Sequence, residues 1–70
     1  MNKRLLTGKE EIIFNKLLNN KTTKQIANDL NISEKTVRNH ISNVIQKLAV
    51  ENRLQAILEL IKLKQIKFKE

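Results

Sequence analysis

Apolar residues recur along the chain at the spacing of an α-helix, in four groups separated by short polar turns. Side chains three or four positions apart lie on one face of a helix, whereas strict alternation indicates a strand. Only the last five residues, 66–70, alternate in a strand-like way, and we expect a frayed end there. The pattern therefore predicts an all-α protein with helices at about 8–19, 23–30, 34–48 and 53–64.

Capping residues mark where these helices begin. Thr7-Gly8-Lys9-Glu10 and Thr22-Thr23-Lys24-Gln25 both have the pattern of a capping box, in which the hydroxyl and the longer side chain satisfy each other's backbone N–H groups. Ser33 is a good N-cap for the third helix. The fourth helix starts with the related pattern Asn52-Arg53-Leu54-Gln55.

Each predicted helix has an apolar face that is expected to form the core. The core positions are Ile13, Phe14, Leu17, Leu18, Ile26, Ala27, Leu30, Val37, Ile41, Val44, Ile45, Leu48, Leu54, Ile57, Leu58 and Ile61. The last helix also carries a second apolar face, formed by Ala56, Leu60 and Leu63. A second face on a chain that is short of core predicts a helix–helix dimer interface at these three residues.

The composition limits what the chain can be. Seventy residues make a single domain, 1–70, with a small core. There is no cysteine and only one histidine, so we expect no disulfide, no metal site and no cofactor. No glycine-rich phosphate loop and no acid–base set accompany the histidine, which argues against an enzyme. Oligomerisation or very good helix packing is therefore expected to compensate for so small a core.

The formal net charge of +7 predicts an anionic partner, either nucleic acid or an acidic membrane surface. The charge is spread evenly along the chain, so it does not locate a binding surface. No apolar run approaches the length of a membrane span, and no signal peptide is present. We therefore expect a cytoplasmic protein. A membrane-active basic peptide is disfavoured because such peptides lack the helix caps and turn residues found here.

Residues 22–48 have the features of a helix-turn-helix unit. Ala27 is the small residue needed where the two helices cross, Asn31 tolerates the left-handed backbone of the turn, and Val37 is the apolar residue that packs the second helix on the first. In such units the second helix enters the major groove of DNA. The residues predicted to contact bases are Arg38, Asn39 and Ser42. The residues predicted to contact phosphates are Thr22, Thr23, Lys24, Lys35, Thr36, His40, Asn43 and Lys47.

Several of these residues also have simpler explanations. Glu34 and Arg38 are four positions apart and can form a surface ion pair. Thr22 and Thr23 can serve as caps, which is compatible with phosphate contact. His40 can be a partly buried, hydrogen-bonded ring. A different class of function is also open: a helix-turn-helix module whose last helix docks a partner such as RNA polymerase, without sequence-specific DNA binding.

The chain resembles the LuxR-type (GerE-like) helix-turn-helix family of transcriptional regulators over about residues 5–63. The resemblance rests on Leu6-Thr7-x-x-Glu10, on residues 21–27, on residues 32–43 with their Thr-Val-x-x-His core, and on the Lys-Leu-x-Val-x-x-Arg-x-x-Ala tail from Lys47 to Ala56. It implies a three-helix DNA-binding core with a C-terminal dimerisation helix. It also implies a homodimer on a promoter element with two half-sites, and the same base and phosphate contacts as above.

The resemblance carries further implications. One stand-alone family member of similar length is a sporulation regulator, which suggests that role here, together with a bacterial, nucleoid-associated location. Many relatives carry a receiver or signal-binding domain, for which this chain has no room, so we expect no small-molecule ligand and control through synthesis. Gly8 and Ile12 depart from the family pattern, and Lys64 replaces a glycine that usually ends the last helix, so that helix is expected to run on. The changes at Ile12 and Lys64 bear on the dimer interface or on a contact with RNA polymerase.

Overall fold

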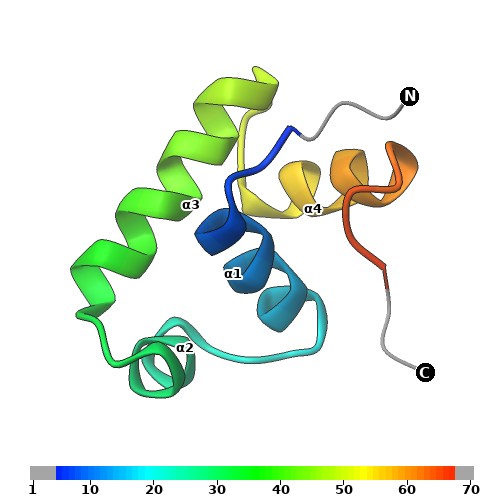
Figure 1. Cartoon of the computed structure of the whole chain (residues 1–70). Helices are drawn as coiled ribbons and strands as arrows, with labels where there is room; N and C mark the ends of the chain where they lie inside the picture. Colours follow the sequence, from blue (N-terminus) through cyan, green and yellow to red (C-terminus); the bar gives the residue numbers. More distant parts are fainter. Residues whose placement is uncertain (1–4, 68–70) are drawn as a thin grey trace.

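The computed structural model describes residues 5–67, and within them the chain forms four helices and no strand. The helices are α1 (Gly8–Leu18), α2 (Thr23–Leu30), α3 (Glu34–Leu48) and α4 (Arg53–Lys62). Figure 1 shows α1 between α3 on one side and α4 on the other, with α2 across one end of the bundle. The longest helix, α3, packs against each of the other three. The predicted all-α fold is therefore confirmed, with α1 and α4 one and two residues shorter than expected.

The helix starts follow the predicted caps. In α1 the Thr7 hydroxyl accepts from the Glu10 N–H at 3.2 Å, and the Glu10 carboxylate accepts from the Thr7 N–H at 3.0 Å. Thr22 and Gln25 make the same reciprocal pair at the start of α2. Asn52 caps α4, but Gln55 bonds to the N–H of Glu51 instead of that of Asn52. Reciprocal boxes thus begin α1 and α2, and single side-chain caps begin α3 and α4.

The helix ends share one motif. The residue that closes each helix has a left-handed backbone: Asn20, Asn31, Ala49 and Lys64, with φ between 57° and 71°. The next residue donates its N–H to the carbonyl five positions earlier, at 2.9–3.2 Å. This is the Schellman arrangement, which satisfies carbonyls at the helix end. Lys64 therefore does not let α4 run on, as the lost glycine had suggested, because the lysine itself adopts the glycine conformation.

Replacing Ala49 or Lys64 by glycine is expected to stabilise the fold. A side chain with a Cβ in the left-handed region is strained by about 1–2 kcal/mol, and part of the gain is offset by the greater freedom of glycine in the unfolded chain. We expect about 1 kcal/mol for each site, or a rise of about 4–8 °C in Tm at fixed protein concentration. Asn31→Gly is the control and should gain less, because asparagine already tolerates this conformation. Equal gains at all three positions would contradict the explanation.

The core is built by all four helices and by the segments that flank them. The buried apolar residues are Leu6, Ile13, Phe14, Ile26, Ala27, Val37, Ile41, Val44, Ala56, Leu60 and Ile66. Ile66 is only 3% exposed, so the expectation of a frayed end is wrong at this residue. Its burial is explained by the turn at Lys64, which directs the chain back onto the core. Residues 68–70, which share that expectation, lie outside the described part of the chain.

The apolar faces of α4 follow the prediction only in part, because Ile57 and Ile61 pack against the core as expected but Leu54 and Leu58 do not. Ala56 and Leu60 are fully buried in the core of this chain, so they are not available as the dimer interface that was predicted for Ala56, Leu60 and Leu63. The side chains left at the surface are Leu54 and Leu58, at 64% and 58% exposure, together with Leu63. Both faces have apolar residues at helical spacing. Which one is buried depends on how α4 packs against α3, and the sequence of α4 does not contain that information.

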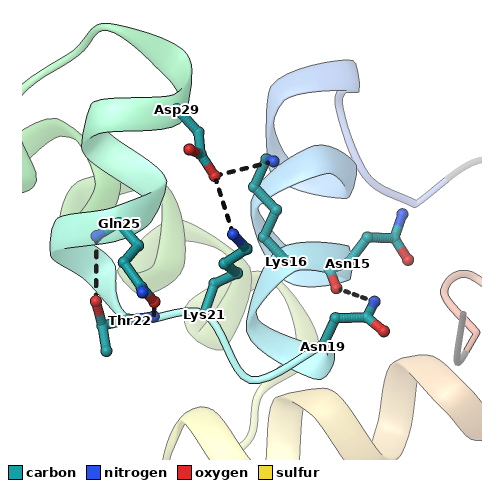
Figure 2. A network of polar contacts seen from close by, with 7 residues as sticks. All are labelled: Asn15, Lys16, Asn19, Lys21, Thr22, Gln25 and Asp29. Atoms are coloured by element: carbon teal, nitrogen blue, oxygen red, sulfur yellow. Dashed lines mark hydrogen bonds and ion pairs between the residues drawn. The ribbon is translucent and has the colours of Figure 1, made fainter.

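A polar network fixes the connection from α1 to α2 (Figure 2). One carboxylate oxygen of Asp29 in α2 accepts from Lys16 of α1 at 3.2 Å and lies 3.8 Å from the ammonium of Lys21 in the connecting turn. The Asn19 amide donates to the Asn15 carbonyl at 2.7 Å and closes the end of α1. The two lysines thus connect α2 to the end of α1, and α2 in turn packs against α3.

Candidate nucleic-acid interface

The α2–turn–α3 unit has the geometry of a helix-turn-helix. Ala27 and Val37 are buried where α2 and α3 meet, as the sequence predicts. Asn31 adopts the expected left-handed conformation, and the N–H of Ile32 bonds to the Ala27 carbonyl at 3.0 Å. The turn is therefore fixed both by its backbone and by the core beneath it. Such support orients α3 rigidly relative to the rest of the chain.

The outer face of α3 is polar and open. Val37, Ile41 and Val44 are buried on its inner face. The exposed residues on the opposite side are Lys35, Arg38, Asn39, Ser42, Asn43 and Gln46, with Thr36 and His40 half-buried at the margin. Within residues 5–67, the side chains of Lys35, Asn39, Ser42 and Asn43 have no hydrogen-bond or ion-pair partner. The structure therefore presents the three residues predicted to contact bases on one accessible face.

Arg38 is the exception, because it has a partner on its own helix. Its guanidinium lies 3.3 Å from a carboxylate oxygen of Glu34, so the ion pair considered from the spacing is present. The same oxygen accepts a hydrogen bond from the Thr23 hydroxyl of α2 at 3.2 Å. The Arg38 side chain remains 57% exposed. The pair therefore orients the guanidinium without covering it.

The N-terminal ends of α2 and α3 contain the other predicted phosphate contacts. The Thr22 hydroxyl caps α2 by accepting from the Gln25 N–H at 3.1 Å, and Lys24 is exposed beside it. The Ser33 hydroxyl caps α3 and lies 2.9 Å from the hydroxyl of Thr36. Helix N-termini favour anions through their free N–H groups and dipole. These hydroxyls and the exposed Lys24 therefore lie at helix ends that are chemically suited to anions.

Lys47 has a structural role that the sequence did not reveal. Its ammonium donates to the Glu10 carboxylate at 2.7 Å and to the Leu5 carbonyl at 3.0 Å. Glu10 is only 5% exposed and also completes the capping box of α1. A buried carboxylate requires a charged or hydrogen-bonding partner. Thirty-seven positions separate the two residues, so only the packing of α1 on α3 brings them together.

The Glu10–Lys47 pair sets a dependence of stability on pH. Burial alone would raise the pKa of Glu10, but the hydrogen bonds from Lys47 and from the Thr7 N–H, together with the lysine charge, outweigh burial and hold the pKa below its ordinary value of 4.5. A carboxyl group with a lowered pKa in the folded state stabilises the fold above its unfolded pKa. That contribution is lost as the pH falls through the lowered value.

Glu10→Gln is therefore expected to reduce the free energy of unfolding at pH 7 by about 1.5–3 kcal/mol, the range for a hydrogen bond to a charged group. The difference from wild type should narrow below about pH 4.5, the ordinary value, as Glu10 becomes protonated. Denaturant unfolding at pH 7, 5 and 3 measures it. Glu51→Gln removes the same charge from an exposed side chain and controls for net charge. A difference that stays constant down to pH 3 would contradict the assignment.

Comparison with known proteins decides the family. The model of "Bacterial regulatory proteins, luxR family" matches residues 4–60, most of the chain. The chain belongs to the luxR family. Proteins of the luxR family are DNA-binding transcriptional regulators, so this chain is a regulator and not an enzyme. The resemblance seen in the sequence is thereby confirmed.

Several relatives are similar to this luxR-family chain. It is 55% identical to the spore germination protein GerE of Bacillus subtilis over 91% of this chain and 86% of that protein. A solved structure of the transcription factor GerE matches with a TM-score of 0.92, at 55% identity, over 96% of this chain and all of the other. The transcriptional regulatory protein DesR of the same species is 44% identical over 74% of this chain. The chain spans only 26% of DesR, so that relative has a large further part.

No metal-binding cluster of His, Asp or Glu side chains occurs within the described residues 5–67. Over the same residues, no helix has the length and apolar character to cross a membrane.

Proposed function

We propose that this luxR-family regulator binds double-stranded DNA sequence-specifically, with α3 in the major groove. The observation that carries the proposal is the open polar face of α3, where Asn39 and Ser42 have no partner within residues 5–67. An unpaired amide can bond to adenine N6 and N7, and an arginine to guanine O6 and N7. The bases are thus contacted by Arg38, Asn39 and Ser42.

The phosphate contacts flank this face on both sides. The residues assigned to them are Thr22, Lys24, Lys35, Thr36, His40 and Asn43, and Thr23 is left out because its hydroxyl already donates to Glu34. Contacts of this kind fix the register of the protein on the duplex and carry little sequence information. Lys47 is left out of the set, because its ammonium already holds Glu10 and the Leu5 carbonyl. Thr22 keeps its acceptor role toward the Gln25 N–H, and its side chain is exposed.

The regulator acts as a homodimer through α4, at the exposed face formed by Leu54 and Leu58. Exposed leucines are unremarkable singly, but these two are four positions apart and form an exposed apolar strip on one face of the helix. The small core of a 70-residue chain favours a partner that covers such a strip. Two-fold symmetry would place the two copies of α3 in successive major grooves of a site with two half-sites.

The biological role is inferred from a relative that matches most of this chain. The 55% identity with a spore germination protein supports a role in sporulation for this chain. Control of transcription in a bacterium places the protein in the cytoplasm, at the nucleoid. RNA polymerase is a further partner, and a regulator that activates transcription is expected to contact it.

Selection of binding sites from a pool of random duplexes, at two salt concentrations, tests the function. We expect an enriched site with two half-sites related by a dyad or in tandem, and an affinity that falls steeply with salt. The absence of any enriched sequence, with only weak salt-sensitive binding, would contradict the proposal. A module that docks a protein partner, the alternative considered from the sequence, would then take its place.

A further inference from the structure

Glu34 is the only carboxylate in the described part of α3 and sits at the first position of that helix, beside the residues assigned to DNA. A negative charge there opposes the approach of phosphates, so its presence needs an explanation. One oxygen of this carboxylate accepts from Thr23 of α2 at 3.2 Å and from Arg38 at 3.3 Å. Glu34 thus ties the principal base-contacting residue to the neighbouring helix.

The pair leaves Arg38 able to contact a base. A guanidinium has five N–H donors, and the contact with Glu34 runs through one terminal nitrogen, Nη1. A bidentate bond to guanine O6 and N7 needs only two donors. Arg38 can therefore contact guanine while it remains bonded to Glu34, and the Thr23 hydroxyl restrains the carboxylate that holds it.

The pair has the opposite effect on contacts with phosphate. Non-specific binding depends on the attraction between free cations and phosphates, without defined donor geometry. A carboxylate 3.3 Å from the guanidinium offsets its charge and repels a phosphate that approaches the same position. Every DNA sequence offers phosphates, but only a cognate site offers a guanine in the right place. Glu34 consequently weakens the attraction of Arg38 to phosphates more than it weakens the contact of Arg38 with that guanine.

We infer that Glu34 is a positioning residue for Arg38 that raises the preference for cognate over unrelated DNA. It does so by orienting the guanidinium for a base edge and by reducing its attraction to phosphates. The inference rests on the proposed sequence-specific binding and adds a residue that determines specificity without being a base contact itself.

Affinities for the selected site and for a scrambled duplex of equal length, measured at 50–200 mM salt, test this inference. Glu34→Gln keeps the shape of the side chain and removes its charge, and Glu34→Ala also removes the restraint on Arg38. Glu51→Gln is the matched control, because it removes the same charge from an exposed residue in the α3–α4 connection. The same two Glu34 variants in an Arg38→Ala background show whether their effects act through Arg38.

We expect Glu34→Gln to tighten binding to the scrambled duplex more than Glu51→Gln does. We also expect Glu34→Gln to tighten binding to the selected site less than it tightens binding to the scrambled duplex. One further phosphate contact steepens the salt dependence by about 0.9 in log–log slope, which adds about 3.5-fold to the loss between 50 and 200 mM. Glu34→Ala should also weaken the selected site. The effects of Glu34→Gln and of Glu34→Ala should disappear in the Arg38→Ala background.

The outcomes separate the two proposals. A wild-type protein that does not distinguish the selected site from the scrambled duplex would overturn the proposed function, and this inference with it. A wild-type preference that Glu34→Gln changes no more than Glu51→Gln does would overturn only the role of Glu34. An effect of Glu34→Gln that persists without Arg38 would show a general charge effect and overturn the positioning role.

Discussion

Glutamate in place of Leu58 is expected to abolish the proposed homodimer and to leave the fold of each chain intact. Leu58 is 58% exposed on α4 and forms one face with Leu54, while the core face of the same helix is formed by Ala56 and Leu60. A carboxylate buried between two copies without a partner is strongly unfavourable. The same carboxylate on a free monomer remains in water. Analytical ultracentrifugation should therefore show a monomer with the wild-type helical circular dichroism spectrum.

The loss of the dimer is expected to weaken binding to DNA by a large factor. When two linked reading helices bind one duplex, the second event is intramolecular and raises the overall affinity by about 10²–10⁴-fold. Leu58→Glu should lose most of this factor on a duplex with two half-sites and little on a single half-site. Measurement of both affinities in the same buffer distinguishes loss of avidity from damage to α3.

Ile12→Glu provides the matched control. Ile12 is 44% exposed on α1, so the substitution places the same new charge on another exposed apolar position outside α4, and it tests the alternative that the departure at Ile12 bears on the dimer interface. It should leave the dimer and the affinity for two half-sites close to wild type. A Leu58→Glu protein that remains dimeric would show that α4 is not the interface.

Leu60→Ala, by contrast, should destabilise the fold by about 2–5 kcal/mol, because Leu60 is fully buried.

Arg38→Ala is expected to cause the second large effect, which is a loss of sequence preference. A bidentate contact between arginine and guanine contributes about 1–3 kcal/mol of discrimination. A homodimer loses the contact in both half-sites, and separated positions add, so the cognate site should weaken by about 2–6 kcal/mol. The affinity for unrelated duplexes should change much less. A repeated selection should then show one relaxed base position in each half-site.

Lys24→Ala is the comparison for Arg38→Ala. Lys24 is exposed at the start of α2 and is assigned to a phosphate, so its loss should weaken all sequences alike and reduce the salt slope by about 1 for each chain, or about 2 for the homodimer. Loss of the ion pair between Arg38 and Glu34 should change the free energy of unfolding little, because surface pairs contribute at most about 1 kcal/mol. If Arg38→Ala weakened cognate and unrelated duplexes equally, Arg38 would be a phosphate contact and the assignment of the base-contacting face would be wrong.

The sequence by itself determined the local structure of this protein and the residues that α3 presents. Thr7, Thr22, Ser33 and Asn52 specify where helices begin, because a cap needs only a short side chain and the backbone three residues away. Asn31 specifies the turn for an equally local reason. The single apolar face of α3 then leaves its other face polar, so the candidate base contacts follow from periodicity.

Only the tertiary structure decided which face of α4 is buried, where the chain ends its last helix, and how Lys47 is used. Leu54 and Leu60 are chemically alike, and only the direction of the neighbouring helices makes one exposed and the other buried. Lys64 adopts a strained backbone because Ile66 gains a place in the core. Lys47 meets Glu10 across thirty-seven positions of sequence. Each of these outcomes depends on contacts between elements distant in the chain, which no local pattern of residues encodes.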